Sequence, residues 1–163
     1  MTRVVREGDT VIDGGANVGY FTNLLSQLVG KTGLVFAVEP TPVNIFKLKR
    51  NLANNATRNV RVVKSPLYSS IAEVTLHLAA HSGYNSLEPS GETVGRMKTI
   101  STTIDAMLDG QVPKLIKLDI EGAEEKALWG AGQALAHKPY VIMELNEDAL
   151  KNLILTASEY GLQ

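Results

Sequence analysis

The sequence predicts an α/β fold with a Rossmann-like, doubly wound and mostly parallel sheet. Two observations lead to this prediction. Short β-branched runs alternate with stretches of helical periodicity, and a glycine-rich turn follows the first run. Strands of a parallel sheet that helices cover on both faces have this apolar composition, and such sheets bind ligands beyond the carboxyl ends of the strands.

Five segments fit buried parallel strands, because each is short, β-branched and bounded by turn residues. They are residues 10–13, 34–39, 60–63, 114–119 and 140–144. Residues 65–113 break the alternation. We expect a strand at 72–77, a polar loop at 81–91 and a further extended piece at 97–104, which together form an inserted hairpin and loop.

Apolar residues at helical spacing predict the covering helices. The first helix has the apolar face Phe21, Leu24, Leu25 and Leu28 and ends at Gly30. A second helix begins at Pro42, and its residues Ile45, Leu48 and Leu52 face inward. A third helix follows Gly122 and contains Glu124, Glu125 and Leu128. The last begins at Asn146, ends at Gly161 and has the stripe Leu150, Leu153, Ile154 and Ala157.

Length and composition indicate one domain over residues 1–163 and narrow the choice of partners. Because the net charge is -1, we expect neither nucleic acid nor a membrane as a partner. The absence of cysteine excludes disulfides, and three scattered histidines argue against a metal site. No signal peptide or membrane span is visible, so a cytoplasmic protein is expected.

The turn at residues 13–19, Asp-Gly-Gly-Ala-Asn-Val-Gly, lies between a strand and a helix. Glycines permit a tight turn there, and the helix start presents free N–H groups to a ligand. As a dinucleotide fingerprint the turn has Ala16 where the second glycine would let the backbone approach a pyrophosphate, which disfavours NAD. The alternative is an ordinary strand-to-helix connection without a ligand.

Four of the five predicted strands end in a carboxylate, namely Asp13, Glu39, Asp119 and Glu144. Parallel strands bring these ends to one edge, so the expected crevice is acidic and suits a cationic ligand. S-adenosylmethionine, with its sulfonium and ammonium groups, is such a ligand, and Glu39 is placed for its ribose hydroxyls. Alternatively, individual carboxylates cap helices or meet solvent.

Asp119 and Glu121 are close in sequence and precede a glycine and a helix. Strand alternation would put them on the same side. Two interpretations stay open for them: they cap the following helix through its dipole, or they face the methyl donor and acceptor.

Three stretches together resemble the FkbM-type S-adenosylmethionine-dependent methyltransferases, a class I methyltransferase family. They are residues 11–22, residues 36–40 and residues 116–124, and the later 128–131 also fits, so the similarity covers nearly the whole chain. Many members methylate hydroxyl groups on small molecules or sugars. The resemblance therefore implies O-methylation of a small hydroxylated acceptor.

The resemblance also implies roles for individual residues. Gly15, Asn17 and Gly19 would wrap the methionine part of the cofactor with Asp13 supporting the turn, Glu39 would hold the ribose, and Pro40 would shape the adenine edge. Tyr20 and Phe21 follow within the same stretch as further cofactor contacts. Ser86 lies in a stretch, residues 85–87, that resembles the family's polar loop near the site or is a plain surface loop.

Two departures from the family pattern qualify the resemblance. Residues 65–67, Ser-Pro-Leu, stand where relatives often carry an acidic or amide residue for the adenine. Two C-terminal strands that the family usually adds are missing after Gly161. Either the chain is a fragment truncated at its C-terminus, or a partner such as a second copy covers the open sheet edge.

For catalysis we expect in-line methyl transfer with Asp119 or Glu121 as general base, and His81 as a second possibility. Two other function classes remain. One is a cofactor-binding or scaffold module without turnover, and the other is an NAD-binding oxidoreductase, which Ala16 and the acidic edge disfavour.

Overall fold

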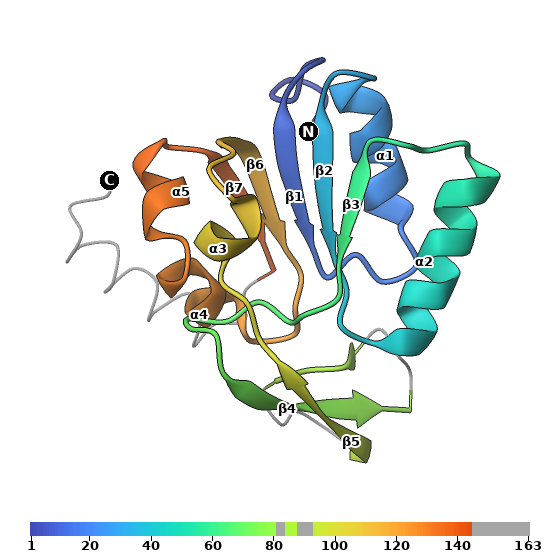
Figure 1. The fold of residues 1–163 in the computed structure, drawn as a ribbon, viewed down its shortest axis with the longest axis vertical. Coiled ribbons are helices and arrows are strands. Elements are labelled where there is room, and N and C mark those ends of the chain that lie inside the picture. The colour runs from blue at the N-terminus through green and yellow to red at the C-terminus, as the bar shows by residue number, and fades with distance from the viewer. Residues whose placement is uncertain (81–83, 88–92, 145–163) are drawn as a thin grey trace.

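The computed structural model describes residues 1–80, 84–87 and 93–144. Its centre is a parallel five-stranded sheet in the order β3-β2-β1-β6-β7 (Figure 1). The strands are β1 (Thr10–Gly14), β2 (Leu34–Val38), β3 (Val60–Val63), β6 (Pro113–Leu118) and β7 (Tyr140–Met143). Because the chain runs outward from β1 to β3 and then returns to the other side of β1, the sheet is doubly wound, as predicted.

Helices cover both faces of this sheet. On one face lie α1 (Tyr20–Val29) and α2 (Pro42–Asn54), with Leu25 and Val29 packed against Val11, Val35 and Leu115. The other face packs its buried residues Ile12, Phe36 and Ile116 against α3 (Ile104–Leu108), α4 (Glu124–Trp129) and α5 (Gly132–Ala136). The alternation along each strand thus supplies two apolar layers, as a two-sided sheet requires.

The predicted apolar face of α1 is only partly right, since Leu25 is buried and Leu28 packs against the core, but Phe21 and Leu24 do not. The buried residues are Thr22, Leu25, Ser26 and Val29, whereas Phe21 and Leu24 are each 37% exposed. The face is rotated because the hydroxyl of Thr22 donates to the buried carboxylate of Asp13, at 2.6 Å. A polar contact with the sheet, absent from a hydrophobicity pattern, therefore decides which side faces inward.

The inserted hairpin is confirmed as an antiparallel pair, β4 (Glu73–Ala79) and β5 (Thr93–Ile100), below the carboxyl ends of the main sheet in Figure 1. The extended piece predicted at 97–104 ends earlier, because Thr103 caps α3 by accepting a hydrogen bond from the Ala106 N–H. Ile104 then enters the core as the first residue of that helix.

Some expectations fall on residues that are not described. The predicted helix after residue 145, His81 and most of the polar loop lie outside the described ranges. Within those ranges β7 is an outer strand of the sheet, and a partner on its edge stays a prediction. None of the described helices has the length and apolar character that a membrane span requires.

Candidate functional site

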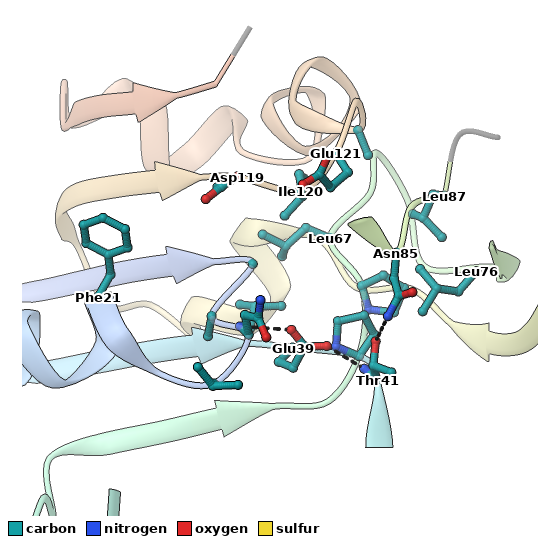
Figure 2. A pocket seen from close by; sticks show the side chains of 18 of the residues that line it. Phe21, Glu39, Thr41, Leu67, Leu76, Asn85, Leu87, Asp119, Ile120 and Glu121 are labelled. Carbon is teal, nitrogen blue, oxygen red and sulfur yellow. Dashed lines mark hydrogen bonds between the residues drawn. The ribbon is translucent and has the colours of Figure 1, made fainter. Parts of the chain in front are cut away.

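A cavity of about 250 Å³ lies at the carboxyl ends of β1, β2 and β6, where the chain direction across the sheet switches (Figure 2). It is bounded by five parts of the chain: the glycine turn with the start of α1, the end of β2, Pro66 and Leu67 after β3, the segment after β6, and residues of the inserted hairpin and its loop. This is the position at which doubly wound sheets bind ligands.

The glycine turn is fixed to its neighbours by backbone contacts. The N–H groups of Gly15 and Ala16 both donate to the Val38 carbonyl, at 3.1 and 2.9 Å. Gly15 has φ +75°, and a Cβ there would lie 1.8 Å from the carbonyl oxygen of Asp119. Glycine is therefore required at position 15 by the close approach of the segment after β6, apart from any ligand.

Glu39 follows β2 and is buried against the turn. Its Oε2 accepts from the Asn17 N–H at 3.0 Å, and its Oε1 accepts from the Thr41 N–H at 2.8 Å. Burial raises the pKa of Glu39, and the hydrogen bonds from Thr41 and Asn17 oppose that rise. The side chains of Thr41 and Asn44 also donate hydrogen bonds to this carboxylate, so it has several partners within the protein.

Asp13 does not line the cavity, so its expected place on an acidic edge is wrong. It is fully buried and accepts from the Thr22 hydroxyl, and its other oxygen lies 3.1 Å from the Lys117 ammonium. Asp13 belongs to β1 itself and its side chain points toward α1, which explains the difference. It supports the turn from behind.

Asp119 and Glu121 both line the cavity, although not through strand alternation. β6 ends at Leu118, and Glu121 and Gly122 have φ of 58° and 99°. Neither acid caps α4, whose N-cap is Ala123. Both acids thus lie in the cavity wall and neither caps the helix, and their facing a methyl donor and acceptor stays a prediction.

Glu124 holds this segment in place, and sequence reasoning gave it no role. Its Oε1 accepts from the Ile120 N–H at 2.8 Å and its Oε2 from the Gly122 N–H at 2.9 Å. These bonds fix the backbone on both sides of Glu121. The position of Glu121 in the cavity wall is therefore set by a buried carboxylate in the first turn of α4.

Glu121 lies among other acids. Burial is the largest cause that raises its pKa, and the negative charges of Asp119, Glu144 and Glu124 raise it further. A carboxyl group in this situation holds a proton more tightly than a free glutamate does, which suits general acid–base chemistry.

Residues beside the inserted hairpin form the opposite wall, where Figure 2 shows Leu76, Asn85 and Leu87. Asn85 accepts from the Ala79 N–H at 2.9 Å and donates to the Thr41 hydroxyl at 3.1 Å. Ser86 is buried outside the cavity and donates its hydroxyl to the Glu121 carbonyl. The short segment 84–87 thereby joins both sides of the site.

The structure brings together most of the predicted site residues. Those that line the cavity are Gly15, Asn17, Tyr20, Phe21, Glu39, Pro40, Asp119 and Glu121. Gly19 lies on the far side of the turn and Ser86 behind the wall, so neither reaches the cavity. The lining residues without a predicted individual role include Thr41, Pro66, Leu67, Leu76, Asn85 and Ile120. Most of these are apolar, and except for Leu76, which lies within β4, only their positions after strands could have indicated them.

Comparison with known proteins gives a family match over nearly the whole chain. The model of the methyltransferase FkbM domain matches residues 13–161. The hexuronic acid methyltransferase AglP of Haloferax volcanii is 30% identical over 142 residues, covering 86% of this chain. The chain spans 57% of the length of that relative.

Solved structures share the fold. The methyltransferase FkbM of Methylobacillus flagellatus superposes with a TM-score of 0.68 at 22% identity, covering 91% of this chain and 37% of that protein. The precorrin-6y C5,15-methyltransferase of Geobacter metallireducens superposes at 0.62 with 15% identity, covering 98% and 66%. These likenesses establish an architecture common to methyltransferases, in agreement with the predicted fold class.

Proposed function

This chain belongs to the methyltransferase FkbM family, and we propose that it binds S-adenosylmethionine in the cavity and transfers the methyl group to a hydroxyl group of a sugar. The observation that carries the proposal is the charge of the lining. Three carboxylates, Glu39, Asp119 and Glu121, line the cavity, and among the described residues no lysine, arginine or histidine does. Such a lining favours a cationic ligand and opposes a pyrophosphate.

The residues of the cavity fit the parts of this cofactor. Glu39 lines the cavity after β2 and would share its carboxylate with the ribose hydroxyls. Pro40, Pro66 and Leu67 supply apolar surface for the adenine ring. Asp119, at the end next to Phe21 in Figure 2, supplies negative charge for a cationic group.

S-adenosylmethionine supplies an already activated methyl group on its sulfonium, so the protein mainly has to align and to accept a proton. As the acceptor oxygen bonds to the methyl carbon, the bond between that carbon and the sulfonium sulfur would break and leave the neutral thioether S-adenosylhomocysteine. The proton of the acceptor hydroxyl would pass to a carboxylate of the cavity. Glu121 is the better placed of the two predicted bases, because its pKa is raised and it lies beside the hairpin wall. Asp119 then does not have to act as the base and would bind a cationic group of the cofactor.

A sugar acceptor is supported by the relative from Haloferax volcanii, whose name gives a hexuronic acid as its substrate. The hairpin wall offers Asn85, an amide of the kind that binds sugar hydroxyls, beside the apolar Leu76 and Leu87. We therefore place the acceptor between this wall and Glu121.

Calorimetry with S-adenosylmethionine tests the cofactor. The unaltered chain should bind it, and Asp119→Asn, which removes a negative charge from the cavity wall, should bind it more weakly. If the folded, unaltered chain binds no S-adenosylmethionine, the proposal is wrong. Titration with NADH, followed by fluorescence, serves as the comparison for the oxidoreductase alternative, which requires nicotinamide binding.

Transfer of labelled methyl groups to a panel of sugars, uronic acids included, tests the reaction. Label should appear on a sugar oxygen and depend on Glu121, with Glu121→Gln at least about 100-fold slower. Cofactor binding without transfer to any member of a broad hydroxylated panel would instead support the cofactor-binding module.

A further inference from the structure

Lys117 is a buried lysine in the central part of the sheet, only 5% exposed. It pairs with Asp13 in the register of β6 against β1, so the two side chains lie next to each other on the α1 face of the sheet. A lysine in such a place requires charged or polar partners, because an isolated ammonium loses its hydration at high cost.

The Lys117 ammonium has partners both in the sheet and at the cavity. It lies 3.1 Å from Asp13 Oδ1 and 3.5 Å from Asp119 Oδ2, and it donates to the Gly14 carbonyl at 3.3 Å. The ring of Phe21 completes its surroundings, with the ammonium 5.2 Å from the ring centre. Asp119 and Phe21 line the cavity, while Asp13 and Gly14 lie behind it.

Stability alone does not account for this arrangement. Asp13 by itself neutralises Lys117, and a buried ion pair contributes little more to folding than apolar side chains of the same volume. The contact of Lys117 with Asp119 does more than neutralise charge. The Asp119 side chain is 39% exposed, and without this contact it would be free to turn toward solvent. The lysine restricts the carboxylate at the point where the cavity needs it.

We propose that Lys117 is a positioning residue, which holds the carboxylate of Asp119 in the cavity wall where that carboxylate binds a cationic group of the methyl donor. The proposal rests on S-adenosylmethionine as the ligand. Asp13 and the Gly14 carbonyl fix the ammonium from behind, so the rigidity of the sheet core extends to the cavity wall.

A double-mutant cycle separates positioning from a structural role. The paired change Asp13→Asn with Lys117→Met removes one charge of each sign, so the net charge is unchanged, and the amide oxygen introduced at position 13 still accepts from Thr22. The affinity for S-adenosylmethionine is measured by calorimetry in this variant, in Asp119→Asn and in the combination of all three changes. Lys114→Met, on the same strand but exposed, is the matched control.

If Lys117 acts through Asp119, the pair of changes weakens binding about tenfold when Asp119 is present and less than about twofold when it is replaced by asparagine. Equal losses in both backgrounds would assign Lys117 a purely structural role and overturn the proposal. No binding by the unaltered chain would instead overturn the proposed function, so the two failures are distinct.

Discussion

The central sheet and the inserted hairpin bound the same cavity but differ in how firmly they are held. All five residues of β1 are buried, and it is paired on both sides. In β5 no residue is buried, and its described pairing is with β4 alone. The polar groups of the sheet side, Asp13 and Glu39, have fixed partners. On the hairpin side, Asn85 and Ser86 reach across to the sheet side.

Under the proposed function, this difference between the two regions fits two separate tasks. A cofactor that is the same in every turnover is best met by a rigid, preorganised surface. An acceptor that varies between related enzymes is best met by an element whose residues can change without disturbing a core. Substitutions on the sheet side should therefore cost stability as well as binding, whereas those on the hairpin side should cost much less.

The largest effect is expected at Gly15. Gly15→Ala places a Cβ against the Asp119 carbonyl in a backbone with φ +75°, so we expect a loss of more than about 4 kcal/mol in the free energy of unfolding. Gly110→Ala is the matched control, since Gly110 has φ +82° but open space around it, and it should lose only about 1 kcal/mol. Similar losses in urea denaturation would show that strain in φ, not the close approach, fixes the turn.

The next largest effect is expected at Glu39. Glu39→Gln leaves one oxygen to serve two N–H groups on opposite sides, so the unfolding free energy should fall by about 2 kcal/mol. The exposed Glu73→Gln on β4 should change it by less than about 0.5 kcal/mol. Chemical denaturation of both variants at one pH makes the comparison, and equal values would contradict the contrast between the two regions.

A smaller effect is expected on the hairpin side. Asn85→Ala removes the contacts with Ala79 and Thr41, and because the site is half-exposed the loss should be about 1 kcal/mol. Asn55→Ala, at the exposed end of α2, is the control and should lose less than about 0.5 kcal/mol. Thermal unfolding measures both, and a loss at Asn85 as large as that at Glu39 would show a hairpin as firmly held as the sheet.

The smallest effect is expected on the pKa of Glu121. Since burial and neighbouring acids raise the pKa of Glu121, the folded chain holds this proton more tightly than the unfolded chain, and stability falls as pH rises from 4.5 through the raised value. Asp119→Asn should lower the pKa of Glu121, and Glu144→Gln should lower it by less, because Asp119 is the larger of the two causes.

Carboxyl-carbon NMR of Glu121 follows this titration directly, without an acceptor. An unchanged titration in Asp119→Asn would mean that the charge of Asp119 does not act on Glu121. Above its pKa Glu121 is ionised and able to take a proton, so methyl transfer should rise with pH through the same window.

Local patterns in the sequence were sufficient to predict the alternation of strands and helices and the glycine turn. They also predicted that Glu39, Asp119 and Glu121 lie at the carboxyl edge of the sheet. Each depends on residues close together in the chain, where periodicity and turn chemistry act. The inserted hairpin was also predictable, because an apolar strand stands apart from the βα alternation.

Only the tertiary structure decided which way these groups face. Asp13 ends a predicted strand like Glu39, yet strand register places it beside Lys117 and α1 turns Thr22 toward it. Lys117 has no local signal at all, since a lysine within a strand is usually exposed. Its burial follows from a partner on β1, far earlier in the chain. Long-range pairing determines such contacts, and no short window of sequence contains both members of the pair.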